Sequence, residues 1–291
     1  MKRKYINGDK MHRINLDKFN LRSDLVNDIE NKSINVDVKK YKNIKVEKTY
    51  INKELSRKIL KKEGNYISII FDDDTDSEMA NKIKKVACEE LRNLLEKKSL
   101  IGKKSLVVGL GNIESTPDSL GPKVIDKVIA TRHLYELSDI DNKYSCVAKI
   151  SPGVYATTGI ESFDIIKGIV KKINPDFLII VDALCSTSVK KLNKVIQITD
   201  SAITPGSGVE NHRKELSKRT IGKEIITIGV PTVVNLHTIV RYFLNEYEIE
   251  EILKEKGNNF LVTPKNIDFE IEKLSFIISN SINNTLHNLT K

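Results

Sequence analysis

One uninterrupted apolar run limits the kind of sheet that this chain can form. Residues 177–181 read FLIIV and are followed directly by Asp182. Strands covered by helices on both faces are apolar throughout, whereas half-exposed strands alternate. Shorter, mostly apolar segments with one polar residue each occur at residues 105–108, 147–150, 195–198 and 225–228. Apolar residues at helical spacing lie between several of them. This alternation predicts an α/β fold, a three-layer α/β/α sandwich with a mostly parallel sheet.

The remaining pattern predicts one domain with an extension. Helical spacing predicts helices over residues 77–98, 160–173, 237–254 and 266–289, and another that begins near Pro122. Residues 66–71 are a further predicted strand. Residues 1–45 are polar and rich in Lys and Asn, and they are interpreted as an amino-terminal extension with a short helix capped by Ser23. Residues 46–291 form the predicted α/β domain.

Composition indicates a cytoplasmic protein. No apolar run approaches the roughly 20 residues that span a bilayer, and no apolar stretch follows the basic start of the chain. The three cysteines are scattered, which is typical of reduced thiols. The net charge of +9 fits either a Lys-rich solvated surface or a basic arm that binds nucleic acid. The lack of interleaved aromatic residues favours the solvated surface, so no direct nucleic-acid binding is expected.

Carboxyl groups follow three of the predicted strands, at Asp118, Asp182 and Asp200. Taken singly, Asp118 could cap the helix at Pro122, and Asp182 could accept backbone N–H bonds. Ligands of α/β sheets bind beyond the carboxyl ends of parallel strands, where two carboxyl groups can share acid and base roles. Gly111, Asn112, Gly206, Ser207 and Gly208 lie in the same loops, and their N–H groups are candidate oxyanion donors.

Other site types lack their residues. Glu114 stands where a dinucleotide motif after Gly109 and Gly111 needs its third Gly, and no P-loop Lys follows. No spaced histidine pair indicates zinc, and the acidic run at residues 72–76 lacks the Gly and Glu of a calcium loop. Cys185 lies three residues after Asp182, but no histidine is placed beside it as a base. Neither a cofactor nor a metal is predicted.

The same loops resemble one family, the germination proteases of spore-forming bacteria. The matching segments span nearly the whole chain, in order: RSDL (22–25), VVGLGN (107–112), TPDSLGP (116–122), TRHL (131–134), PGV (152–154), TGIE (158–161), DIIKG (164–168), PDF (175–177), VDAL (181–184), PGSGV (205–209), GVPTVV (229–234) and LVTPK (261–265).

The resemblance implies an atypical aspartic-type endopeptidase with Asp118 and Asp182 as its catalytic pair. Members cleave small acid-soluble spore proteins in germination, mature from zymogens by loss of an amino-terminal propeptide, and form tetramers. Their core fold is similar to that of hydrogenase maturation proteases. The expected location is therefore the forespore or spore core.

The chain departs from the longer members of this family. Only residues 235–260 separate the GVPTVV and LVTPK segments, so this is a short form, and Cys185-Ser186-Thr187 follows Asp182-Ala183-Leu184. Two alternatives stay open. One is a metal-dependent peptidase of the hydrogenase-maturation type, and the other is a non-catalytic basic binding protein.

Overall fold

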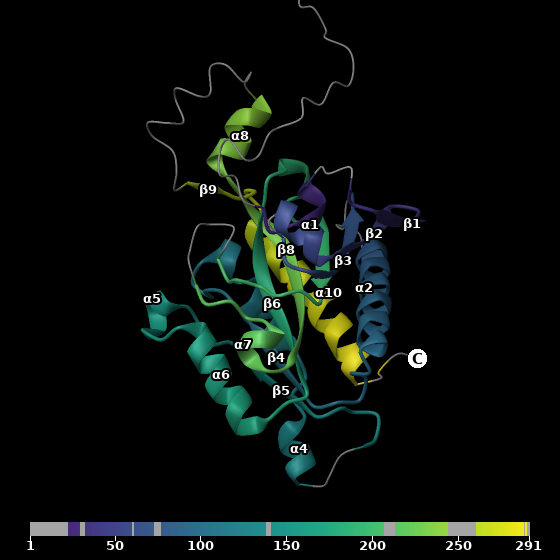
Figure 1. The fold of residues 1–291 in the computed structure, drawn as a ribbon, viewed down its shortest axis with the longest axis vertical. Helices are drawn as coiled ribbons and strands as arrows, with labels where there is room; N and C mark the ends of the chain where they lie inside the picture. Colours follow the sequence, from purple (N-terminus) through teal and green to yellow (C-terminus); the bar gives the residue numbers. More distant parts are fainter. Residues whose placement is uncertain are drawn as a thin grey trace, which may run out of the picture.

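The computed structural model describes residues 23–29, 33–59, 61–72, 77–137, 141–206, 213–243, 260–287 and 289. Within these residues, helices cover both faces of one sheet (Figure 1). The strand order is β1-β2-β3-β7-β8-β6-β4-β5, and β9 (Leu261–Val262) pairs with β8. The predicted α/β sandwich is therefore confirmed, with a mixed sheet.

Four strands form the parallel part of the sheet. They are β5 (Val147–Ile150), β4 (Ser105–Gly109), β6 (Phe177–Ser186) and β8 (Glu224–Asn235), which pair in that order. Residues 177–181 of β6 are fully buried, because helices lie over both faces of this strand. The carboxyl ends of all four strands meet at one edge, which is where a ligand site is expected.

The other part of the sheet is antiparallel. It runs from β8 through β7 (Val195–Thr199), β3 (Gly64–Phe71) and β2 (Ile44–Ile51) to β1 (Val36–Tyr41). Residues 187–194, which include η4 (Val189–Lys191), connect β6 to β7 without a long crossover. A parallel return would need a crossover of a dozen residues or more, so β7 runs against β6 and β8.

Helices pack on the two faces through separate cores. On one face, α2 (Ser77–Lys97), α3 (Leu120–Lys127) and α10 (Ile267–Leu286) pack against the sheet. On the other face, α6 (Ser162–Ile173) and α7 (Lys218–Ile221) bury residues of β4 and β6. The predicted helices over residues 77–98, 160–173 and 266–289 are confirmed.

Shorter helices complete the described chain: α1 (Lys53–Ile59), α4 (Arg132–Glu136), α5 (Tyr155–Thr158) and α8 (Leu236–Phe243). The helix predicted over 237–254 begins as α8, and residues 244–254 lie outside the described residues. Among the helices that the structure describes, none combines the length and the apolar character needed to cross a bilayer.

The amino-terminal boundary predicted at residue 45 falls inside β2. β1 pairs antiparallel with residues 44–49 of β2, from Val36 opposite Thr49 to Tyr41 opposite Ile44, and Ile44 and Val46 are buried in the main core. Residues 36–45 therefore belong to a hairpin of the sheet, and a cut at residue 45 would divide it. The short helix near Ser23 is the 3₁₀ turn η2 (Val26–Asp28), and residues 1–22 lie outside the described part.

Candidate active site

Asp182 lies inside a strand, not after one. β6 and β8 continue their pairing to Ser186 and Val234, so both strands extend beyond the predicted runs, which end at residues 181 and 228. Asp182 stands opposite Gly229, and alternation along β6 places its side chain on the same sheet face as Ile180. It is 6% exposed. The carboxyl group is thus held by a rigid, buried element.

The loop after β4 brings Asp118 to this strand. The backbone N–H of Leu110 donates to the carbonyl of Val181 over 2.8 Å, so the chain stays against β6 where β4 ends. It then returns through η3 (Thr116–Asp118), which contacts both β6 and β8. The N–H of Asn112 donates to Oδ2 of Asp118 over 2.8 Å. Asp118 is therefore held by a backbone group beside Asp182.

Gly111 makes this turn possible. Its φ is +114°, and a Cβ atom there would lie 2.0 Å from the backbone oxygen of Asp118. Any side chain at this position would push Asp118 away. Helix α3 has Ser119 as its N-cap residue, without a side-chain capping bond. The alternative interpretation of Asp118 as the helix cap is therefore wrong.

The two carboxyl groups occupy unequal surroundings. Burial raises the pKa of Asp182 well above its usual 3.8, and the nearby charges of Asp118 and Asp24 raise it further. Burial also raises the pKa of Asp118, but the N–H of Asn112 and the charge of Arg213 oppose that rise. Asp182 thus retains its proton more readily than Asp118.

A third carboxyl group approaches from the amino-terminal segment. The N–H of Asp24 donates to the carbonyl of Cys185, and Oδ2 of Asp24 accepts the N–H of Cys185, each over 2.9 Å. Sequence reasoning missed this residue as part of the site. Its signal was the RSDL segment at residues 22–25, which belonged to the family resemblance but was assigned to the extension.

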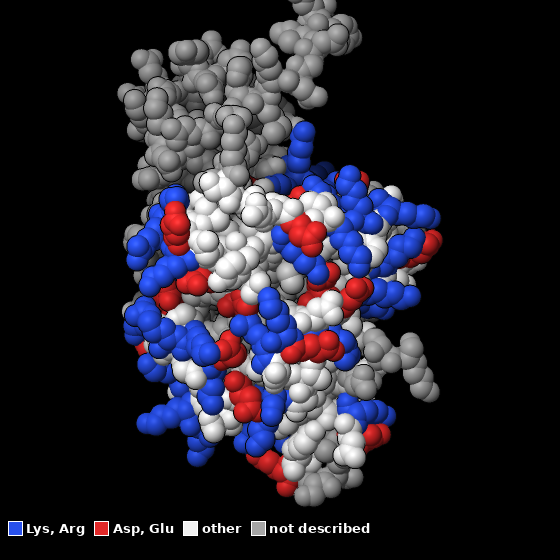
Figure 2. All heavy atoms as spheres, turned by 45° about the vertical axis from the view of Figure 1, so that its right-hand side comes forward, with Lys and Arg blue, Asp and Glu red and all other residues white. Residues whose placement is uncertain are grey.

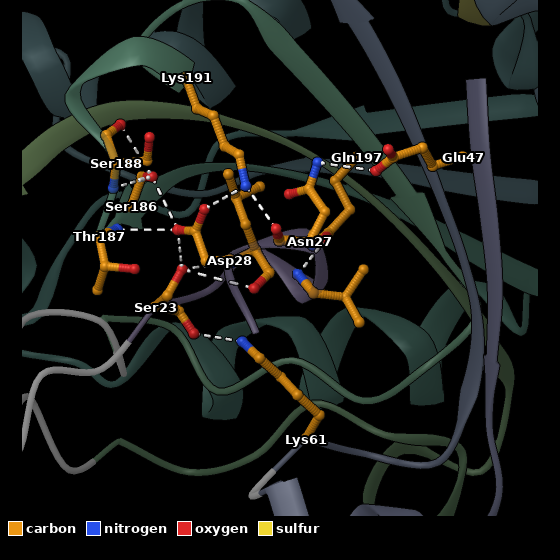
Figure 3. Close-up of polar contacts among 12 residues, drawn as sticks. Ser23, Asn27, Asp28, Glu47, Lys61, Ser186, Thr187, Ser188, Lys191 and Gln197 are labelled. Carbon is orange, nitrogen blue, oxygen red and sulfur yellow. Dashed lines mark hydrogen bonds and ion pairs between the residues drawn. The ribbon is translucent and has the colours of Figure 1, made fainter. Parts of the chain in front are cut away.

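A buried network around Asp28 fixes the same segment on β6 (Figure 3). Asp28 accepts hydrogen bonds from Ser23 Oγ at 2.5 Å, Ser186 Oγ at 2.8 Å and the N–H of Thr187 at 2.8 Å, and it forms an ion pair with Lys191 at 2.7 Å. Burial alone would raise the pKa of Asp28, but Lys191 and these hydrogen bonds outweigh it and lower that pKa. The carboxylate is thus a charged anchor for residues 23–28.

Two further side chains hold the backbone of this segment. Lys61 Nζ donates to the carbonyl of Ser23, and Gln197 of β7 both accepts from the N–H of Val26 at 2.8 Å and donates to the carbonyl of Asp24 at 3.2 Å. Because these contacts involve main-chain groups, they set the path of the segment whatever side chains it carries.

Asp200 does not join the other carboxyl groups. It accepts hydrogen bonds from the N–H of Asn65 at 2.6 Å and forms an ion pair with Lys98 at 3.0 Å. Lys98 also pairs with Glu224, which begins β8. Asp200 follows β7, and an antiparallel strand ends at the opposite edge of the sheet from β6. The prediction that placed Asp200 at the site is therefore wrong.

Some of the remaining residues predicted for the site lie within the described part of the structure, and others lie outside it. Gly206 occupies a turn with a φ of +71°, and Ser207 and Gly208 lie outside the described residues. The N–H of Asn112 is taken by Asp118, so it positions that carboxyl group. Cys185 is 2% exposed, and burial raises its pKa to about 12, which makes it a poor nucleophile.

The carboxyl groups at this edge raise the question of a metal ion. Within the described ranges, no three His, Cys, Asp or Glu side chains are grouped so that they could hold a metal ion. His212 lies outside those ranges. The described side chains alone therefore do not provide a set of metal ligands at this edge.

Paired carboxyl groups with unequal proton affinity, one inside β6 and the other in η3 beside it, define a candidate acid–base hydrolase. A sequence model described as germination protease matches residues 12–247. The chain is 34% identical to the germination protease of Priestia megaterium, covering 90% of this chain and 88% of the relative. It is 35% identical to that of Oceanobacillus iheyensis, with the same coverage of each chain. The chain belongs to the germination protease family and is a peptidase.

Two further comparisons add detail. The germination protease of Bacillus subtilis is 34% identical, covering 84% of this chain and 83% of the relative. The Priestia megaterium alignment spans 327 positions, more than the 291 residues of this chain, so that relative carries additional residues within the match. The hydrogenase maturation protease HycI from Thermococcus kodakarensis is 18% identical with a TM-score of 0.35, over 62% of this chain and 94% of the other. That likeness is too distant to support an argument.

Proposed function

We propose that this chain is an endopeptidase that initiates the degradation of small acid-soluble spore proteins during germination. Hydrolysis is of an atypical aspartic type, with Asp118 and Asp182 as the catalytic pair. The observation that carries the proposal is the approach of these two carboxyl groups in surroundings that separate their proton affinities. Membership of the germination protease family supports a role in germination, and the resemblance to that family implies the substrate class.

Peptide hydrolysis requires an activated water and a proton for the leaving nitrogen. Asp118 takes the role of the ionised partner, because burial and neighbouring carboxylates raise the pKa of Asp182 well above its usual value, whereas the N–H of Asn112 and the charge of Arg213 oppose the rise in the pKa of Asp118. It orients and deprotonates the water. Asp182 holds its proton in the buried strand and donates it towards the substrate. One shared proton thus serves the pair, as two close carboxyl groups need not both ionise.

Maturation, assembly and location belong to the same proposal. The enzyme is made as a zymogen in the forespore, loses an amino-terminal propeptide, and works in the spore core as a homotetramer. Leu25 is fully buried and Val26 nearly so. Removal that spares both residues would keep their packing intact, which supports a propeptide that ends before Leu25.

Incubation of the purified protein, both full length and trimmed of its amino-terminal segment, with a small acid-soluble spore protein tests the reaction, with fragment masses as the readout. Asp118→Asn and Asp182→Asn each abolish cleavage while the far-ultraviolet circular dichroism spectrum is retained. Asp200→Asn is the matched control, because it removes a carboxyl group at the opposite edge, and it retains cleavage. Full activity in either of the first two variants refutes the pair.

The same assay separates the alternatives. Loss of cleavage on chelation, restored by a divalent metal, would support a metal-dependent peptidase instead. Absence of any cleavage together with DNA binding that weakens steeply with salt would support a basic binding protein.

A further inference from the structure

Strand β1 (Val36–Tyr41) is the outermost strand of the sheet, at the right-hand border of Figure 1. Among the described residues, only β2 pairs with it. Its first five residues are all exposed, including Val36 at 46% and Val38 at 43%. An unpaired edge that also exposes β-branched residues is a ready template for another strand. Figure 2, which brings this side forward, shows that Lys and Arg predominate over it, with Asp and Glu among them.

The two faces of β1 differ in their surroundings. Lys39 lies 3.7 Å from Glu89 of α2 and 4.7 Å from the ring centroid of Tyr41, so residues 37, 39 and 41 face the helices. Val36, Val38 and Lys40 share the opposite face. Both valines are thus on the side away from α2, and packing within the described chain leaves them open to solvent.

We propose that β1 pairs antiparallel with β1 of a second copy of this chain, about a two-fold axis at Val38. In this register Val38 faces its own counterpart, and Asp37 of each copy faces Lys39 of the other. Because the axis relates the two copies, the ion pair between Asp37 and Lys39 forms twice. The strands of the two copies then form one continuous sheet, and the two Val38 side chains pack against each other, which lowers their exposure to water.

Charge selects this register over its neighbours. A two-fold axis perpendicular to the sheet leaves each side chain on the same face in both copies. Residues directly opposite each other must also share a face, so the axis has to lie between one residue and the same residue of the second copy. An axis at Lys39 would place the two Lys39 side chains directly opposite each other, and an axis at Asp37 would do the same with two carboxylates. Like charges in directly opposed positions are destabilising. Only the axis at Val38 pairs opposite charges and apolar side chains together.

This surface is separate from the candidate active site. Five strand spacings separate β1 from β6, which corresponds to about 24 Å at roughly 4.8 Å per strand. The inference therefore does not depend on the proposed peptidase function, and it assigns a surface to the proposed assembly. Variants of β1 can change the oligomeric state while the surroundings of Asp182 stay as they are.

Disulfide trapping tests the register in the full-length chain. The Val38→Cys variant, in a Cys146→Ser background, forms a covalent dimer on mild oxidation, because the two-fold axis places the new thiols opposite each other. Val36→Cys is the matched control with the same exposure. Its two thiols lie four residues apart along the strands, about 13 Å, beyond the roughly 7 Å limit for Cα atoms of a disulfide. Equal trapping in both variants, or none in Val38→Cys, overturns the proposal.

A charge swap supplies a second readout, the mass in sedimentation equilibrium. Asp37→Lys places like charges opposite each other twice and weakens association at least tenfold. The double variant Asp37→Lys, Lys39→Asp restores opposite charges and recovers association. An unchanged association constant in Asp37→Lys, or failure of the double variant to recover while it remains folded, contradicts the pairing. If a peptide other than β1 of a second copy pairs with this edge, the double variant will fail to recover association.

Discussion

Replacing Asp182 by Asn should stabilise the fold at neutral pH, although it removes a catalytic group. Burial, and then the charges of Asp118 and Asp24, raise the pKa of Asp182 well above 3.8. Between 3.8 and that raised pKa, the native protein holds a proton that the unfolded chain has released. The free energy of unfolding therefore falls as pH rises through this interval. An amide cannot ionise, so the variant escapes this loss.

The magnitude scales with the pKa shift. Each pH unit between the unfolded and native pKa corresponds to about 1.4 kcal/mol. Asp182 is 6% exposed, so solvent screening reduces this little. One kcal/mol moves the melting temperature of a domain of this size by about 2–4 °C. The two proteins should thus melt alike near pH 4, and the Asn variant should melt several degrees higher at pH 8.

Thermal unfolding of both proteins from pH 4 to pH 8 measures this difference. Asp28→Asn is the control with the opposite sign. Lys191 and hydrogen bonds outweigh the effect of burial and lower the pKa of Asp28, so its charged form stabilises the fold. That variant loses stability at neutral pH, and its deficit shrinks as pH falls below about 3.8. An Asp182→Asn variant that melts lower than wild type at pH 8, or a gain that does not grow with pH, refutes the reasoning.

Three further outcomes follow from single side chains. Gly111→Ala should abolish cleavage and lower the free energy of unfolding by about 2 kcal/mol or more, because a φ of +114° is strained for Ala and the new Cβ would meet the backbone of Asp118. Cleavage and melting of the same variant measure both effects. Cys185 should resist iodoacetamide at pH 8 in the native protein and react once the chain is denatured, as peptide mass spectrometry would show. Burial lowers the pKa of His287, whose neutral ring contacts the carbonyl of Ile129, so the free energy of unfolding should fall as pH drops below about 6.5. His287→Gln should flatten this dependence of the melting temperature on pH, and an unchanged dependence counts against the prediction.

Periodicity predicted the layers of the fold well because burial on two faces leaves a strong signal. The run at residues 177–181 became the central strand, and α2, α6 and α10 follow their apolar spacing. Strand direction carries no such signal. The antiparallel course of β7 depends on a short connection and on pairing with β3, which are tertiary features. The sheet was therefore predicted in content but not in polarity.

The site was predicted as far as local patterns reach. Asp118 and Asp182 were identified from their positions beside apolar strands, and the structure brings them together. Asp200 carries the same local pattern but follows a strand of opposite direction. Asp24 has no strand before it, and long-range contacts such as those of Gln197 and Cys185 with its backbone bring it to the site. The two errors have different causes: the direction of β7 misplaced Asp200, and tertiary contacts that leave no local pattern placed Asp24.

The position of Asp24 also couples the amino-terminal segment to the chemistry of the pair. The charge of Asp24 raises the pKa of Asp182, so a seated Asp24 favours the protonated form of that group. Linkage is reciprocal, and ionisation of Asp182 must therefore weaken the seating of Asp24 by the same free energy. Lys61 and Gln197 oppose that weakening, because they hold main-chain groups that do not titrate. Loss of either contact would let Asp24 move away and so lower the pKa of Asp182. The difference in pKa between Asp118 and Asp182 would then become smaller.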